Sequence, residues 1–500
     1  MKKIGVVLAA AACAAVLESN AEVHVVPMPQ KVVETGGSFV YSGTIKNLKV
    51  VEDPSIPEEG YRLSVTPEGV KIAASGEAGK FYALQTLEQM KDAVVGIGRF
   101  SVPCVEIDDA PRFKWRGVHF DDCRHFFGKE ALKRTLDAMA YQKLNVLHWH
   151  LTDDQGWRIE INKYPLLTKI GSVRPGSPKR ESDLTGLEKK NRKDRWVNDG
   201  KKYGPYFYTQ SDIKEIVAYA AARHIRIVPE IELPGHSVAA IAAYPELGCT
   251  GRKVEPWWKW GVSPDIFCAG NDKTIKFLED VLDEVCKLFP GDVIHIGGDE
   301  APKKRWAACP KCQKRIKDLS LKGEEGLQGW MTRHFTDYLA KKGKRAVGWD
   351  EVLAGDPGKD TIVMSWRGAA GGIAAAKRGN DVVMTPNTFC YLDYNPHLKG
   401  DTLEYLAGNL PLVKVYSFNP TDGIPAGQHK HILGGQGNNW SECTWTPAEL
   451  EWKMWPRMSA LSEVFWTQPA AKDYASFRKR AKVLRRTLKS HFKINCSPVQ

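Results

Sequence analysis

The chain has 500 residues, of which 43% are hydrophobic and 26% are charged, and its formal net charge is +12. These proportions are ordinary for a soluble globular protein and leave enough apolar residues for a sizeable core in one large domain or in two or three smaller ones. The positive charge could attract anionic polymers, but no nucleic-acid motif accompanies it, so we expect no nucleic acid as partner. The basic run 189–195 is most simply a solvated loop, with sulfated or sialylated glycans as an alternative partner.

The first residues have the pattern of a secretory signal peptide. Met1-Lys2-Lys3 precedes an apolar run from Ile4 to Leu17, and Ser19-Asn20-Ala21 offers small residues for cleavage. We expect residues 1–21 to be removed and the protein to be secreted or periplasmic. A lipid anchor at Cys13 is less favoured because only alanines stand directly before it. No later stretch reaches the roughly 20 apolar residues of a membrane span, so we expect no transmembrane segment.

Residues 22–109 predict a small α+β domain. Short alternating strands at 61–65 and 70–72 flank a turn at Pro67-Glu68-Gly69, and a helix is expected over 79–90. Asp108-Asp109-Ala110-Pro111 then forms the joint to the rest of the chain.

Residues 110–500 alternate apolar strands with helical segments. Eight such strands predict a parallel (β/α)8 barrel of the TIM type, whose active sites lie at the carboxyl ends of the strands. The expected strands are 117–120, 145–150, 225–231, 293–296, 345–349, 361–366, 381–384 and 432–435. A last helix, over 474–492, has one apolar face and is expected to cover the outside of the barrel.

The most informative segment is the fourth strand, which ends in Gly297-Gly298 and is followed by Asp299 and Glu300. Neighbouring strand residues point to opposite faces, so the two acids have different tasks unless the chain turns there. A glycosidase needs this division of tasks, because one acid protonates the leaving oxygen while another group organises the substrate. Two solvated acids on a glycine turn are the simpler alternative.

Aromatic and acidic residues at other strand ends favour the glycosidase reading. Tryptophans bind the apolar faces of sugar rings, and carboxylates accept hydrogen bonds from the hydroxyls. The residues concerned are Trp349 with Asp350 and Glu351, Trp366, Tyr391 with Asp393, and Trp440 with Glu442.

With these segments the chain resembles glycoside hydrolase family 20, the β-N-acetylhexosaminidases. The resemblance covers the barrel almost from end to end and extends to the small preceding domain, with Pro27-Met28-Pro29 near its start. Its motifs are Trp115-Arg116-Gly117, Arg124-His125-Phe126, 148–154, Pro234-Gly235-His236, 295–300, Gly348-Trp349-Asp350-Glu351, Tyr391-Leu392-Asp393 and Trp440-Ser441-Glu442.

The resemblance implies a retaining exo-β-N-acetylhexosaminidase that acts by substrate-assisted catalysis. Glu300 would be the general acid and base. The acetamido oxygen of the sugar would attack C1 and give an oxazolinium ion, with Asp299 holding the acetamido N–H and Tyr391 its carbonyl oxygen.

The resemblance also implies the residues that hold the sugar. Arg116 would bind the 3- and 4-hydroxyls, Asp393 and Glu442 the 4- and 6-hydroxyls, and three tryptophans would wall the acetamido group and ring: Trp349, Trp366 and Trp440. Asp153 and His236 would support the protonation of Glu300. The partner is a glycan with a terminal N-acetylhexosamine, and no cofactor is expected.

The chain departs from the family pattern at two places. Glu232 stands where relatives commonly have Asp, and no tryptophan lies between Tyr394 and Gly434. The tryptophan loop 257–260 could bind the leaving group instead, or pack beneath its own backbone.

Two other functions remain as alternatives. A metal-dependent hydrolase could use His148, His150, Asp153, His236, His295 and Asp350. A non-catalytic sugar-binding protein would lack an acid or its partner, yet Asp299, Glu300 and Tyr391 are all present.

The cysteines suggest a local bond rather than a metal site. Cys309-Pro-Lys-Cys312 resembles half of a zinc site, but the chain has no second Cys-x-x-Cys. A disulfide or two free thiols are therefore expected there, and no metal.

Overall fold

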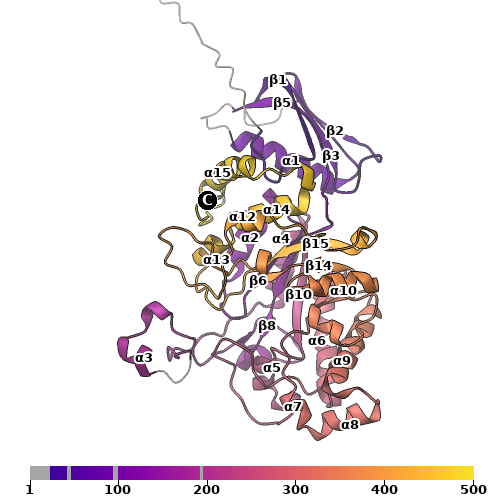
Figure 1. The fold of residues 1–500 in the computed structure, drawn as a ribbon, viewed down its shortest axis with the longest axis vertical. Coiled ribbons are helices and arrows are strands. Elements are labelled where there is room, and N and C mark those ends of the chain that lie inside the picture. Colours follow the sequence, from indigo (N-terminus) through magenta and orange to yellow (C-terminus); the bar gives the residue numbers. More distant parts are fainter. Residues whose placement is uncertain (1–22, 42–46, 94–99, 192–194) are drawn as a thin grey trace, which may run out of the picture.

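The computed structural model describes residues 23–41, 47–93, 100–191 and 195–500. A small sheet domain lies at one end of the molecule and a barrel with surrounding helices forms the rest (Figure 1). The proposed signal peptide and Cys13 lie outside the described residues, as does part of the basic run. Among the described residues, no helix combines the length and the apolar character that crossing a membrane requires.

The N-terminal domain is a five-stranded sheet in the order β1-β5-β3-β4-β2, covered on one face by a helix. Tyr61, Leu63 and Val65 are fully buried while the residues between them are not, which is the two-residue period expected of a strand. The elements are β1 (Lys31–Tyr41), β2 (Leu48–Glu52), β3 (Tyr61–Thr66), β4 (Gly69–Ala74), α1 (Glu77–Asp92) and β5 (Phe100–Asp109).

Within the described residues, eight parallel strands close into a barrel, and every strand expected from the sequence is present. Their residues are buried on both faces, because side chains fill the barrel inside and helices cover it outside. The (β/α)8 prediction is confirmed. The strands are β6 (Trp115–Asp121), β7 (Val146–His150), β10 (Arg226–Leu233), β11 (Val293–Gly297), β12 (Arg345–Trp349), β13 (Ile362–Ser365), β14 (Val382–Met384) and β15 (Ile432–Gly437).

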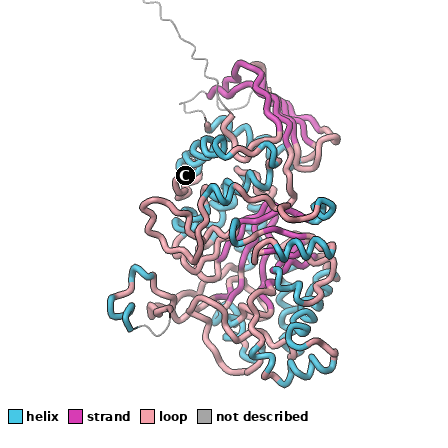
Figure 2. Tube along the Cα trace, viewed as in Figure 1, coloured by secondary structure: helices cyan, strands magenta, loops and turns pink. Residues whose placement is uncertain are grey.

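Helices of unequal length connect these strands, and between β12 and β13 the chain forms only the 3-10 turn η4 (Asp350–Ala354). Figure 2 shows the barrel strands enclosed by helices and long loops. The helices are α2 (Lys129–Tyr141), α3 (Gly186–Asn191), α4 (Gln210–Ala221), α5 (Val238–Ala243), α6 (Asp272–Leu288), α7 (Lys304–Ala307), α8 (Pro310–Asp318), α9 (Gly323–Ala340), α10 (Ala370–Arg378), α11 (Asn387–Cys390), α12 (Leu412–Tyr416), α13 (Pro447–Met454), α14 (Arg457–Trp466) and α15 (Tyr474–Ser490).

The small elements are the two-residue strands β8 (Thr152–Asp153) and β9 (Gly156–Trp157), and five further turns of 3-10 or π helix: η1 (Leu167–Gly171), η2 (Glu181–Asp183), η3 (Pro245–Leu247), η5 (Ala426–His431) and η6 (Pro469–Ala471).

The two parts of the chain share a buried interface. Asp109, at the end of β5, accepts a 2.8 Å bond from Trp466 and pairs with the buried Lys143 at 3.0 Å. Helix α15 lies on the same side, where Arg480 binds both Glu463 of α14 and the backbone oxygen of Val25. The sheet domain is thus fastened to the amino-terminal end of the barrel, opposite the strand ends that carry the acids.

Candidate active site

A small pocket opens at the carboxyl ends of the barrel strands, where the sequence predicts the chemistry. Its walls come from the loops that follow six of the eight strands and from Trp349 at the end of a seventh, β12, so residues far apart in the sequence meet there. The lining residues are Arg124, His236, Asp299, Glu300, Trp349, Trp366, Tyr391, Tyr394, Leu406, Trp440 and Glu442.

Backbone conformation explains why two adjacent acids line the same pocket. Gly297, Gly298 and Glu300 have φ angles of +64°, +102° and +42°, so the strand breaks into a tight turn at its end. A Cβ atom at Gly297 would lie 1.8 Å from a carboxylate oxygen of Glu232, which leaves glycine as the residue that fits. The turn removes the strand alternation, and Asp299 and Glu300 both face the cavity.

His236 sits between these acids as a buried cation. Its Nε2 atom lies 3.6 Å from Asp299 and 3.6 Å from Glu300. Burial opposes a charge on this ring, but the Asp153 carboxylate, 3.2 Å from Nδ1, outweighs it and holds the pKa of His236 well above its usual range.

The pKa values of the two acids are shifted in opposite directions. Burial raises the pKa of Asp299 to about 6, although His236 opposes the shift. Glu300 is partly exposed, and its contact with His236 lowers its pKa. The Oδ1 atom of Asp299 is buried and has no hydrogen-bond partner among the described residues.

Asp153 stands behind the pocket rather than in its wall. It is buried and binds His150 at 2.8 Å, Arg124 at 2.8 Å and His236. His150 in turn contacts Glu230 in the centre of the barrel. Asp153 therefore connects the pocket with a charged network in the interior of the barrel.

Three tryptophan and two tyrosine rings line the pocket. Trp366 and Tyr391 stack with ring centroids 6.1 Å apart, and Trp349 lies 5.8 Å from Trp440. Trp349 donates to Glu230 at 2.9 Å and Trp366 to Glu351 at 3.0 Å, which fixes both rings. Burial holds the pKa of Tyr391 well above its usual range, so its hydroxyl is a neutral donor.

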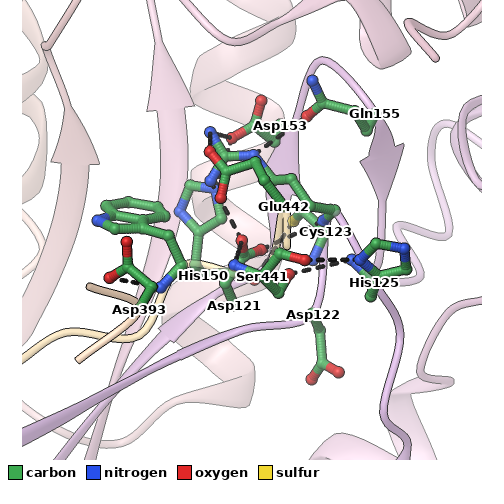
Figure 3. A network of polar contacts seen from close by, with 12 residues as sticks. Asp121, Asp122, Cys123, His125, His150, Asp153, Gln155, Asp393, Ser441 and Glu442 are labelled. Carbon is green, nitrogen blue, oxygen red and sulfur yellow. Dashed lines mark hydrogen bonds and ion pairs between the residues drawn. The ribbon is translucent and has the colours of Figure 1, made fainter. Parts of the chain in front are cut away.

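Arg124 and Glu442 line the pocket, and Asp393 lies beside it, where it accepts from the backbone N–H of Trp440 at 3.5 Å. Asp393 Oδ2 and Glu442 Oε2 are buried and have no hydrogen-bond partner in the part of the chain that the structure describes. Arg124 lies 3.9 Å from the other oxygen of Glu442 and is held by Asp121 at 3.1 Å and Gln155 at 3.1 Å. Figure 3 shows Asp121, Asp153, Gln155 and Glu442 in this network.

The structure corrects the prediction for Arg116. This residue follows the first residue of β6 and so lies at the amino-terminal end of the barrel, where it binds Glu59 of the small domain at 2.8 Å and the backbone oxygens of Phe113 and Lys143. Arg124, which follows the carboxyl end of the same strand, is the arginine that lines the pocket. The rule that active sites lie at carboxyl ends of barrel strands would have separated the two.

A second cavity adjoins the first through Glu300 and Trp366. Its volume is about 540 Å³, and Val262, Lys303 and Glu351 also line it. The tryptophan loop does not line either cavity: Trp260 is buried between His125 and Arg174. Tyr394 and Leu406 occupy the wall where the sequence lacks a tryptophan.

The residues of the metal-dependent alternative are divided in the structure. His148 and His295 hold Glu230 at 3.1 Å and 2.8 Å in the barrel interior. Asp350 pairs instead with Arg367 at 2.6 Å and fixes the turn after β12.

Comparisons with known proteins agree with this geometry. Residues 113–469 match the family described as glycosyl hydrolase family 20, catalytic domain, and residues 9–110 match its domain 2. A β-hexosaminidase of Porphyromonas gingivalis is 44% identical over 89% of this chain, which spans 55% of that relative's length. A β-hexosaminidase of Akkermansia muciniphila is 33% identical over 93% of this chain and 90% of its own length.

Solved structures show the same relationship. A family 20 exo-β-N-acetylglucosaminidase of Vibrio harveyi, in complex with N-acetylglucosamine, superposes with a TM-score of 0.83 at 29% identity and covers 96% of this chain and 78% of its own. Sequence, fold and the paired acids at the end of β11 lead to one conclusion: the chain belongs to glycosyl hydrolase family 20.

Proposed function

We propose that the protein is a retaining exo-β-N-acetylhexosaminidase that releases terminal β-linked N-acetylglucosamine or N-acetylgalactosamine. One observation carries the proposal: Asp299 presents a buried acceptor without a partner beside Glu300, in a pocket walled by aromatic rings. An acetamido N–H would satisfy that acceptor. The family membership and the N-acetylglucosamine in the Vibrio harveyi relative support the same sugar class.

The shape of the pocket supports action at chain ends. The aromatic wall suits one sugar ring, and the unpartnered oxygens of Asp393 and Glu442 would accept bonds from its hydroxyls. Arg124 would donate to a hydroxyl between them, because its planar group presents several N–H donors. The wider cavity beyond Glu300 leaves room for the rest of the glycan.

The reaction proceeds in two displacements at C1. The acetamido oxygen attacks C1 and closes an oxazolinium ring while Glu300 gives its proton to the departing oxygen. Glu300 then takes a proton from water, the water oxygen bonds to C1, and the ring opens to give the β-sugar. Two inversions leave the configuration unchanged.

Asp299 and Tyr391 act on the acetamido group during these steps. A negative charge on Asp299 stabilises the positive charge that develops on the ring, and this stabilisation is strong where water is excluded. The neutral Tyr391 hydroxyl donates to the carbonyl oxygen and orients it toward C1.

Glu300 must hold a proton when the substrate is bound, although His236 lowers its pKa in the empty pocket. A glycan in the wider cavity would remove water from Glu300, and loss of solvent disfavours the charged form. Substrate binding itself thus helps to protonate the acid.

Release of p-nitrophenol from its β-N-acetylglucosaminide tests the proposal. Wild type should act on this substrate and not on the β-glucoside, which lacks the acetamido group. Glu300→Gln should lower kcat/KM by ~10²–10⁴-fold, the usual worth of a positioned proton donor. The exposed Glu130→Gln on α2 is the matched control. Equal rates on the glucoside, or an unimpaired Glu300→Gln, would refute the assignment.

We also propose that the protein is exported with cleavage near Ala21, on the strength of the charged, apolar and small-residue segments at 1–21. The mass of the amino-terminal peptide from protein secreted by its host tests this. A chain that still begins at Met1, or one that carries lipid on Cys13, would contradict it.

A further inference from the structure

We propose that Cys249, Cys268, Cys309 and Cys312 together bind one structural zinc ion at a site separate from the sugar pocket. The first two cysteines lie in the loop between β10 and α6, and the other two lie in the loop between β11 and α9. Helices α5, α7 and α8 of these loops gather at the end of the molecule away from the N-terminal sheet (Figure 1).

The distances between the sulfur atoms match those between cysteine sulfurs that bind one metal ion. The Sγ atom of Cys312 lies 3.8 Å from that of Cys249 and 3.7 Å from that of Cys268, and Cys268 lies 3.7 Å from Cys309. All four sulfurs lie within 4.8 Å of one another. Tetrahedral zinc with Zn–S bonds of ~2.3 Å places its sulfurs about 3.8 Å apart.

The chemistry of the donors also fits zinc. Cys268, Cys309 and Cys312 are buried and Cys249 is half-buried, so the four sulfurs turn toward one another inside the protein. Four sulfurs in a tetrahedral arrangement select zinc or iron over the hard cations. Sulfurs at 3.7–3.8 Å are not joined in a disulfide, whose sulfurs lie ~2.05 Å apart.

The two loops pack closely against each other around the cysteines. A Cβ atom on Gly270 would lie 2.2 Å from the backbone carbon of Lys311, so the segment after Cys268 packs directly on the first turn of α8. Trp306 donates to the backbone oxygen of Phe267 at 2.8 Å, and Arg305 pairs with Asp265 at 2.8 Å. These contacts hold the four sulfurs in place without the ion.

Charge in the second loop complements the site. A zinc ion with four thiolates carries a net charge of about −2, which has to be counted in the local electrostatics. Residues 303–317 contain seven lysines and arginines and no acidic residue.

The position of the four cysteines suggests a structural role for the ion. The loop with Cys249 and Cys268 also contains His236, and the loop with Cys309 and Cys312 also contains Glu300. Zinc would join these two loops beside the wider cavity that Val262 and Lys303 line. It would thereby stiffen the leaving-group side of the site without touching the reacting sugar.

Metal content of the purified protein tests the proposal without any substrate, so its result does not depend on the proposed glycosidase activity. Wild type made in zinc-supplemented medium should contain ~1 zinc per chain by plasma mass spectrometry. Cys312→Ser should lose nearly all of it, and Cys249→Ser, at the half-buried edge, should bind zinc more weakly. Cys286→Ser on α6 changes a half-buried thiol outside the cluster and should keep its zinc.

A measurement on wild type tests the proposal even if the cysteine variants do not fold. Titration of folded wild type with a mercurial should release zinc in step with the modification of the four thiols, detected with a chromogenic chelator. Protein free of zinc, protein with iron in its place, or a mass that shows these cysteines paired as disulfides would overturn the proposal. Zinc retained by Cys312→Ser would also overturn it.

Discussion

The Nε2 atom of His236 lies 3.6 Å from the Oδ2 atom of Asp299, and the same nitrogen is equally close to Glu300. One buried cation thus contacts both proposed catalytic acids. Burial raises the pKa of Asp299, whereas the hydrogen bond with His236 lowers the pKa of Glu300. The predictions below follow from this arrangement and from the surroundings of the pocket.

Asp299→Asn should lower the rate more than the affinity. The amide keeps the size of the side chain but removes the negative charge that stabilises the oxazolinium ion, so we expect kcat to fall by ~10²–10³-fold with a smaller change in KM. Steady-state kinetics on the β-N-acetylglucosaminide measure both. A loss confined to KM would show that Asp299 only binds substrate; the exposed Asp108→Asn is the control.

The pH profile of kcat/KM should be a bell with an acidic optimum. The reaction needs Asp299 charged and Glu300 protonated, and the two pKa values of the pair bound the active range. The pKa of Asp299 is about 6 and that of Glu300 is below its usual range, so between these values the pair holds one proton, and the active molecules are the minority that carry it on Glu300. Above about pH 6 the pair loses this proton, so activity should decline. A rate that rises steadily into alkaline pH would contradict this assignment.

His236→Asn should move that profile to higher pH. The histidine cation favours the charged form of both carboxyls, so its removal raises both pKa values, by about one unit for a contact of this kind. Profiles of wild type and variant, each normalised to its own maximum, show the shift. An unmoved profile with only a lower maximum would mean that His236 supports the structure alone.

Substitution of Arg116 should lower the stability of the protein, whereas substitution of Arg124 should lower its activity. Arg116→Met leaves Glu59 without its cationic partner at the domain interface, while Asn145 and Tyr82 still donate to it. We therefore expect the free energy of unfolding to fall by about 3 kcal/mol with KM of the folded enzyme unchanged. Arg124→Lys loses the planar donor in the pocket and should lower kcat/KM by ~10²-fold. Urea unfolding and steady-state kinetics on both variants measure these effects. A raised KM in Arg116→Met would show that Arg116 binds the sugar after all.

Glu232→Gln should stabilise the protein increasingly as pH rises. Burial, with Asp299 and Glu230 nearby, holds the pKa of Glu232 well above 4.5, and neither of its oxygens has a partner among the described residues. A raised pKa means that the stability present below the unfolded-state pKa is lost as pH rises above it. The amide has no charge to bury, so the difference in melting temperature between variant and wild type should grow between pH 4.5 and pH 8. A difference independent of pH would refute a neutral Glu232.

Most of the fold could be predicted because its signals are local. Each barrel strand is an apolar run, and each expected strand overlaps an observed one; the helix expected at 79–90 appears as α1 (Glu77–Asp92). The Gly-Gly break before Asp299 and Glu300 is likewise local, since glycine alone tolerates the turn. Family and barrel are confirmed on these signals.

The sequence by itself determined the strands, their order and the two acids at the end of β11, because apolar periodicity and glycine conformation depend on neighbouring residues. Only the tertiary structure decided what each arginine contacts: Arg116 pairs with Glu59 of the small domain, and Arg124 lines the pocket. It also brought Cys249 and Cys268 to Cys309 and Cys312. The packing of two long loops sets the distance between these cysteines. Their separation along the sequence therefore does not reveal that they are close together.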